Sequence, residues 1–355
     1  MKIKSLLINL GCLSAILMGG FSCSPRQEYY GVTDFEKVPK IDGHFHYVTM
    51  DERYLDFAAS LNFKLLSPNV DSETPIDKQL EIASGITGRN KGRFGFFGTF
   101  SVDSFGNTDF ASLTIARIRE CMQKGATGIK IWKNIGMDLQ DEDSNYVMID
   151  NPAFEPVFQY LEENKIPVIA HLGEPKNCWL PADEMTDDGD RNYYENHPRY
   201  HMYLHPEMPS YDDQINARNN ILVRYPHLDV IGAHLGSLEW DVNELARHLD
   251  RFPNMKVDMA ARIGHLKNQS AKNRKLVRDF MIKYQDRIIY ATDMSANDDL
   301  NDNFDKAVAR FRRTWLADWI YLATDSATTV DGLQLPKEVI DKIYFGNAAY
   351  LISAQ

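Results

Sequence analysis

Five histidine and aspartate side chains of this sequence stand where they could hold a metal ion. His44 and His46 are two positions apart in the segment IDGHFH, and His171, His234 and Asp293 each end a separate apolar run. In a β-strand, residues i and i+2 point to the same face, so both imidazoles of the pair project together. Imidazole and carboxylate groups suit Zn²⁺ and related divalent ions. The five side chains therefore predict a metal site if the fold brings them together.

The apolar runs that carry these residues alternate with amphipathic segments. Segments with helical periodicity include 112–123, 152–163, 213–224, 242–251 and 273–284. The runs predict strands at 38–46, 63–68, 94–100, 128–132, 167–171, 228–234, 255–260 and 288–293. This alternation predicts an α/β fold with a parallel sheet, and eight strands close a (β/α)₈ TIM barrel, whose strands end at one shared rim. A doubly wound sheet is the competing arrangement, but no GxGxxG motif follows the first strand.

Two segments are longer than a minimal barrel needs. Residues 173–212, after the fifth strand, are rich in Pro, Asp, Tyr and His. They predict an insertion on the face where barrels build their active sites, as a lid or a substrate wall. Residues 301–335, after the eighth strand, contain an extra amphipathic helix predicted at 304–322. One elaborated barrel domain over 38–355 fits this pattern better than two domains.

Several segments resemble a known enzyme family. IDGHFH, IAHLGEP, IGAHLGS, YATDM and IYFGNAAYL look like the amidohydrolase superfamily. The resemblance is closest to the branch of amidohydrolase-2 hydrolases and aminocarboxymuconate-semialdehyde-type decarboxylases, and it runs from about residue 40 to residue 352. It implies a ligand set and a catalytic pair. The implied metal ligands are His44, His46, His171 and Asp293, and the implied catalytic residues are His234 and Asp293.

The chemistry that this resemblance implies is metal-dependent hydrolysis. A metal held by neutral imidazoles and a carboxylate lowers the pKa of its water to about 7. Asp293 could take a proton from that water, and His234 could polarise the scissile carbonyl. We expect an enzyme that cleaves a C–O or C–N bond of a small lactone, ester or amide. A metal-dependent decarboxylase on the same barrel and a non-catalytic, ligand-binding surface lipoprotein remain the alternatives.

Four further residues are candidates for the site. Lys130, on the fourth strand, has three interpretations: a carboxylated bridge between two metals, a substrate-binding cation, or a structural residue. One Zn²⁺ is therefore expected, or two if Lys130 is carboxylated. Arg262 follows the seventh strand and could bind an anionic group of the substrate. Glu174 and Trp179 lie in the loop after the fifth strand and could also contact substrate.

The composition and the N-terminus bear on partners and location. The chain has 355 residues and a formal net charge of −11, which argues against a nucleic-acid partner. Residues 1–22 have a basic start, an uncharged apolar stretch and small residues, and thus predict a signal peptide. Cys23 then resembles a bacterial lipoprotein cleavage site, and 23–37 reads as a polar tether. We expect an exported periplasmic or cell-envelope protein, held to the membrane if Cys23 is acylated; a homo-oligomer is compatible with the sequence.

Overall fold

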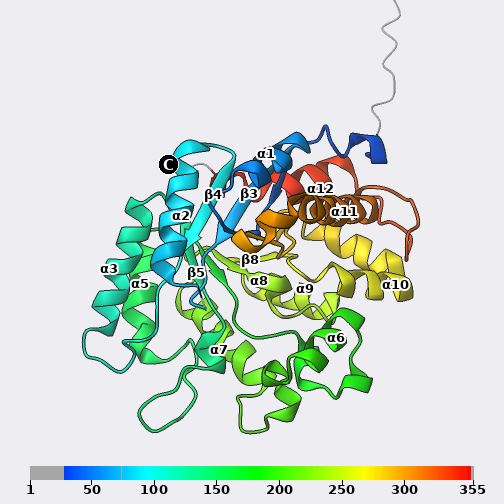
Figure 1. The fold of residues 1–355 in the computed structure, drawn as a ribbon. Coiled ribbons are helices and arrows are strands. Elements are labelled where there is room, and N and C mark those ends of the chain that lie inside the picture. The colour runs from blue at the N-terminus through cyan, green and yellow to red at the C-terminus, as the bar shows by residue number, and fades with distance from the viewer. Residues whose placement is uncertain (1–27, 73, 353–355) are drawn as a thin grey trace, which may run out of the picture.

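Eight parallel strands form a curled, TIM-barrel-like sheet in the computed structural model, which describes residues 28–72 and 74–352 (Figure 1). The strands are β1 (Lys40–Asp42), β3 (Phe63–Pro68), β4 (Phe94–Gly98), β5 (Gly128–Ile131), β6 (Val168–Ala170), β7 (Val230–Gly232), β8 (Met255–Asp258) and β9 (Ile288–Ile289). They are hydrogen-bonded in this order, each parallel to the next. The predicted (β/α)₈ fold is confirmed.

Helices surround the sheet and bury one face each against it (Figure 1). The longer ones are α1 (Arg53–Ser60), α2 (Ile76–Arg89), α3 (Phe110–Gln123), α5 (Glu155–Glu163), α7 (Tyr211–Arg224), α9 (Val242–Arg251), α10 (Ile263–Lys283) and α11 (Phe304–Ala323). Helix α9 shows why they form. Its buried Val242, Leu245 and Leu249 recur at helical spacing, and the Asp241 side chain caps its first turn. The predicted extra helix after the eighth strand is α11.

Short helices complete the described chain. They are α4 (Asn134–Met137), α8 (Ala233–Gly236), α12 (Lys337–Asp341), α13 (Ala349–Ile352), the π-helical turn Lys342–Gly346 and the 3₁₀ turns Val32–Asp34, Pro152–Phe154 and Asp298–Asn303. The insertion after β6 holds α6 (Asp188–Asn196) and the 3₁₀ turns Lys176–Trp179, Ala182–Glu184, Pro198–Tyr200 and Met202–Leu204. Its apolar side chains form a small core of their own, which includes Cys178, Tyr194 and Met202. The insertion therefore packs as a folded unit over the rim.

The first and last strands meet at a seam that closes the barrel. The predicted strand 38–46 is divided into β1 and β2 (His46–Val48), and β2 pairs with β10 (Ser295–Asn297). Between these pairs, the Gly43 amide donates to the Tyr290 carbonyl at 2.9 Å. A Cβ on Gly43 would lie 2.5 Å from the Ile289 side chain, so only glycine permits this approach.

Residues 28–37, the described part of the predicted tether, pack against the barrel. Tyr29 forms an antiparallel bridge with Pro336, and the Trp319 indole donates to the Gly31 carbonyl at 3.1 Å. Phe35 is 1% exposed. The prediction of a tether does not hold for these residues, because Phe35 anchors them in the apolar core.

The remaining N-terminal predictions fall on other residues. The predicted signal peptide, 1–22, and the predicted lipidation site, Cys23, lie outside the described residues. Within the part of the chain that is described, no helix is both long and apolar enough to cross a membrane. Export and lipid attachment therefore stay predictions.

Candidate metal centre and active site

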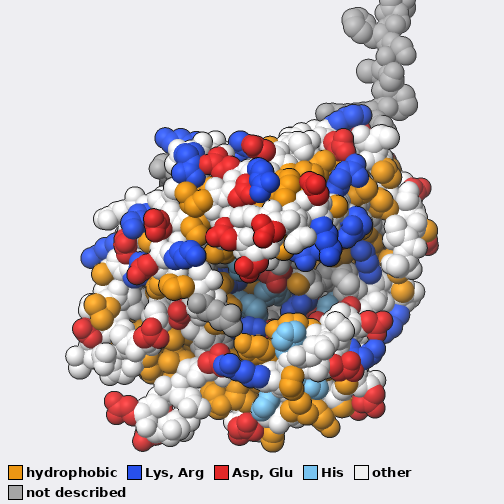
Figure 2. All heavy atoms as spheres, viewed as in Figure 1, with side chains coloured by type: hydrophobic (Ala, Val, Ile, Leu, Met, Phe, Trp, Pro, Cys, Tyr) orange, Lys and Arg blue, Asp and Glu red, His pale blue; other side chains and the backbone are white. Residues whose placement is uncertain are grey.

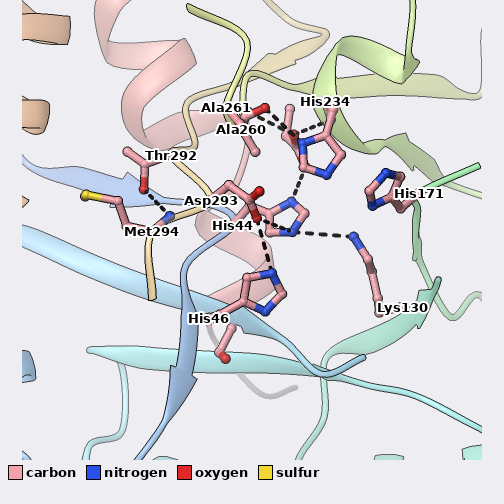
Figure 3. Close-up of polar contacts among 12 residues, drawn as sticks. His44, His46, Lys130, His171, His234, Ala260, Ala261, Thr292, Asp293 and Met294 are labelled. Atoms are coloured by element: carbon pink, nitrogen blue, oxygen red, sulfur yellow. Dashed lines mark hydrogen bonds and ion pairs between the residues drawn. The ribbon is translucent and has the colours of Figure 1, made fainter. Parts of the chain in front are cut away.

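Three of the predicted metal ligands form one cluster at the carboxyl ends of the strands (Figure 3). The Nε2 atoms of His44 and His46 lie 3.5 Å and 3.2 Å from Oδ1 of Asp293. Ligand atoms about 2 Å from one tetrahedral ion are about 3.3 Å apart. The cluster therefore has the donor types and the spacing that a single divalent ion requires. The seam creates it, because the Asp293 amide donates to the His44 carbonyl at 2.8 Å.

His171 lies beside this cluster rather than inside it. Its ring centroid is 4.3 Å from that of His234 (Figure 3). Burial lowers the pKa of His171 to about 4, so the imidazole is neutral at neutral pH. Its Nε2 atom is buried, has no hydrogen-bond partner among the described residues, and lies 3.6 Å from a carboxylate oxygen of Glu174. A buried polar atom without a hydrogen-bond partner is rare. A role of His171 as the fourth metal ligand would explain why its Nε2 atom has none.

Asp258, at the end of β8, holds two of the histidines in place. Its Oδ2 atom lies 2.8 Å from Nδ1 of His44, and its Oδ1 atom accepts a hydrogen bond from the His234 amide at 2.8 Å. Burial alone would raise the pKa of Asp258, but His44, His234 and Lys130 hold it at about 2. The ionised carboxylate therefore fixes the proton of His44 on Nδ1 and leaves Nε2 free to bind a metal.

The two predicted catalytic residues have complementary charge states. Burial lowers the pKa of His234 well below its ordinary value, so its imidazole is neutral. Burial acts to raise the pKa of Asp293, but the imidazoles of His234, His46 and His44 outweigh it and hold the pKa well below the usual range. Nδ1 of His234 lies 2.9 Å from the Ala260 carbonyl, which can only accept, so the proton is on Nδ1 and Nε2 is a proton acceptor.

Both predicted catalytic residues adopt left-handed backbone conformations. His234 has φ 60° and Asp293 has φ 65°. For residues other than glycine this region costs roughly 1–2 kcal/mol, and such strain gathers where the surrounding structure fixes a functional geometry. Both side chains line the same cavity.

A cavity of about 310 Å³ connects this centre to the insertion. Its walls are Lys133, His171, Glu174, Asp187, Gly189, Asp190, Tyr193, Tyr194, His234, Ala261, Arg262 and Asp293. Figure 2 shows the molecule hollowed here, with histidine side chains visible inside. Tyr193 and Tyr194 come from α6, so the insertion forms one wall. The size suits a small molecule, and the groups around it are mainly polar.

The four other predicted site residues differ in their placement. Lys130 is buried with its ammonium 3.4 Å from Nε2 of His44, and burial lowers its pKa to about 8. Arg262 lines the cavity, 3.9 Å from Asp190. Glu174 lines it too and forms an ion pair with Lys133. Trp179 lies elsewhere, in the insertion, where its indole donates to the Pro209 carbonyl.

The comparisons with known proteins agree with this arrangement. Residues 41–352 match the model of the amidohydrolase family Amidohydro_2. The chain belongs to this amidohydrolase family. The resemblance in the sequence motifs is thereby confirmed. No curated protein matches the chain.

Solved structures place the amidohydrolase among TIM barrels. An uncharacterized TIM-barrel protein from Bordetella bronchiseptica has a TM-score of 0.53 and 14% identity, over 89% of this chain and 98% of that one. A 2,6-dihydroxybenzoate decarboxylase from Rhizobium has a TM-score of 0.50 and 15% identity, over 89% and 98%. A protein described as amidohydrolase II has a TM-score of 0.50 and 15% identity, over 88% and 99%. At these identities the likeness shows the fold.

Proposed function

We propose that this amidohydrolase is a metal-dependent hydrolase that cleaves a C–O or C–N bond in a small lactone, ester or amide. One observation carries the proposal. An ionised carboxylate, Asp293, which clusters with His44 and His46, lines the same cavity as a neutral imidazole, His234. Hydrolysis needs a proton acceptor for water and a proton donor for the leaving group, and these two residues can supply both.

His44, His46 and Asp293 would hold the ion, with His171 as the fourth ligand. Zn²⁺ is our first choice because the donors are imidazole nitrogens and a carboxylate oxygen. Such an ion would act as a Lewis acid and would lower the pKa of a water molecule, so that hydroxide is available as the nucleophile at neutral pH. We propose one ion per chain; a second would require that Lys130 be carboxylated.

The chain's own groups then divide the proton transfers. Asp293 is ionised and can accept the proton of the attacking water. His234 can take up this same proton at Nε2, while Nδ1 stays bonded to the Ala260 carbonyl, and pass it to the leaving group. Arg262 and the pair of Lys133 with Glu174 provide charged groups that orient a polar substrate in the cavity.

A metal and activity measurement tests the proposal. We expect one metal ion per purified chain, and turnover of at least one member of a panel of lactones, esters and amides. Asp293→Asn should abolish turnover, and the double variant His44→Ala/His46→Ala should lose the metal. Asp298→Asn is the matched control, since this exposed rim carboxylate bonds to Thr49 and lies outside the cavity. Equal metal content in wild type and double variant would overturn the proposal.

A metal-dependent decarboxylase is the second candidate. A 2,6-dihydroxybenzoate decarboxylase has the same fold, and the cavity contains Arg262, a cation that could bind a carboxylate. Release of CO₂ from aromatic acids, without hydrolysis of any ester or amide, would favour this candidate. Binding of a ligand with no turnover, unchanged by Asp293→Asn, would instead support a non-catalytic lipoprotein.

We also propose that the chain is exported and carries a lipid on Cys23. The support is the order of basic, apolar and small residues before Cys23. In a bacterial host, the mature wild-type protein should begin at Cys23, carry the added mass of acyl chains and sediment with membranes. Cys23→Ser should remain unacylated. An unprocessed N-terminus in the wild type would contradict the proposal.

A further inference from the structure

The carboxylate of Asp42 lies at the centre of the barrel seam. Asp42 ends β1, two residues before His44, and is fully buried. Its Oδ1 atom accepts hydrogen bonds from the Thr292 amide at 3.0 Å and the His44 amide at 3.4 Å. Its Oδ2 atom accepts from the Thr292 hydroxyl at 2.6 Å. The carboxylate thus binds the residue before Asp293 and the backbone of His44 at the same time.

A fourth hydrogen bond comes from outside the barrel proper. The indole nitrogen of Trp315, on α11, donates to Oδ2 of Asp42 at 2.9 Å. Trp315 is fully buried, and its ring stacks on Phe63 with centroids 4.4 Å apart. A phenylalanine could make this stacking contact equally well. Ring packing therefore does not explain the indole N–H group, which donates to Asp42.

Helix α11 also reaches the residue between the two histidines. Phe45 lies 5.2 Å from Phe311 and 6.2 Å from Trp315, measured between ring centroids. Phe45 is fully buried among these rings, whereas His44 and His46 belong to the ligand cluster. The extra helix therefore supports the histidine pair on one side and, through Asp42, the Asp293 turn on the other.

We propose that Trp315 is a positioning residue for the metal centre, acting through the Asp42 carboxylate on His44 and Asp293. The inference rests on the proposed metal-dependent function. Asp293 has a strained left-handed backbone, so its turn needs bonds that hold it there. A buried carboxylate that loses one donor is left partly unsatisfied, and the remaining donors to Asp42 are groups of His44 and Thr292, beside the proposed ligands. Residues behind metal ligands typically contribute 10–100-fold in metal affinity.

The chain offers a matched control on the same helix. Trp319 lies one helical turn after Trp315 and is equally buried, and its indole also donates one hydrogen bond, to the Gly31 carbonyl. Trp315→Phe and Trp319→Phe therefore remove the same atoms from the same core, but only the first touches Asp42. Thr292→Val provides a second route with little change in shape, because it removes the hydroxyl that donates to the same carboxylate and accepts from the Met294 amide.

The experiment measures the Zn²⁺ dissociation constant by competition with a chelator, and the thermal unfolding of the metal-free proteins. We expect Trp315→Phe and Thr292→Val to bind Zn²⁺ at least 10-fold more weakly than wild type, and Trp319→Phe to stay within about 2-fold. The visible absorption of the Co²⁺-loaded protein should change with Trp315→Phe and not with Trp319→Phe. If Trp315→Phe fails to fold, Thr292→Val decides.

Two failures can be told apart. A wild-type protein that binds no Zn²⁺ would overturn the metal-dependent function and this inference with it. A wild type that binds Zn²⁺ as tightly as Trp315→Phe and Thr292→Val do would overturn the inference alone. Equal weakening by Trp319→Phe would also overturn it, since the effect would then come from core packing.

Discussion

Nδ1 of His44 and Oδ2 of Asp258 lie 2.8 Å apart, and both side chains are 1% exposed. His44 follows the first strand of the barrel, β1, and Asp258 ends the seventh, β8, so this bond joins the ends of two separate strands. It holds the His44 ring in one orientation and in one tautomer. Because the other Asp258 oxygen binds the His234 amide, a single carboxylate links the proposed metal ligand His44 to the proposed catalytic residue His234.

Asp258→Asn should weaken metal binding by about 10–100-fold. A carboxylate accepts from both His44 and the His234 amide, whereas an asparagine offers its oxygen to one of them and an N–H group to the other. Chelator competition measures the effect. Asp318→Asn is the control, since Asp318 is also buried but bonds to Tyr290 and Lys267. Equal metal affinities for the two variants would contradict this role of Asp258.

His234→Asn should separate catalysis from metal binding. His234 is outside the cluster of His44, His46 and Asp293, so the metal content should stay at the wild-type level. Turnover should fall by about 10²–10⁴-fold, the usual contribution of one acid/base group. Elemental analysis and steady-state kinetics on the same preparation check both halves. Loss of the metal would show that His234 is a ligand.

Lys40 should make stability depend on pH. Its ammonium is buried, bonds to the Phe35 and Val38 carbonyls and lies over aromatic rings, and burial lowers its pKa from 10.5 to about 7. Between pH 7 and 10.5 the unfolded chain holds a proton that the folded chain lacks. The free energy of unfolding therefore rises with pH in this window through Lys40.

Lys40→Met should remove this contribution, so the variant should gain less stability than wild type between pH 7 and pH 9. Urea unfolding at several pH values measures the slope. Lys78→Met, at an exposed position of α2, should keep the wild-type slope. Identical slopes for wild type and Lys40→Met would rule out this role of Lys40.

Lys133 and Glu174 form an ion pair in the cavity wall with side chains 13% and 5% exposed. Removing one partner leaves a buried charge uncompensated, so Lys133→Met or Glu174→Gln alone should destabilise the protein by about 3–5 kcal/mol. The double variant should cost clearly less than the sum. The exposed pair of Lys275 and Asp279 is the control cycle, with a coupling below about 0.5 kcal/mol. Additive costs at Lys133 and Glu174 would refute strong coupling.

The barrel could be predicted because its buried strands have mainly apolar sequences. Residues 94–98, for example, are all buried, which gives the continuous apolar run typical of a strand in a parallel sheet. The break at Gly43 could not be predicted, because it depends on how closely the chain passes Ile289. The packing of 28–37 was missed because Tyr29, Tyr30 and Phe35, in an otherwise mainly polar segment, follow no helical or strand periodicity.

The candidate site was predictable only where residue type and strand position coincide. His44 and His46 follow the first strand of the barrel and Asp293 follows the last, so barrel closure brings them together. Asp258 also ends a strand, in the segment MKVDMA, but its position in the sequence does not indicate which histidine it will bond to. Trp179 follows the same strand as His171, yet the path of the insertion turns it away from the cavity. Irregular loops follow no period, so side-chain direction there cannot be predicted from spacing.

The seam has a consequence for how the centre is assembled. Asp42 and Thr292, which flank the ligands on its two sides, stand 250 positions apart in the chain. Forming a contact between residues so far apart in the chain closes a loop of nearly the whole domain, which costs conformational entropy. We therefore expect this contact to form late in folding. Tight metal binding therefore requires a finished barrel. Zn²⁺ uptake during refolding would accordingly report the last step, closure of the barrel. A chain that ends before residue 293 would retain His44 and His46 but lack Asp293, and it should bind the ion weakly.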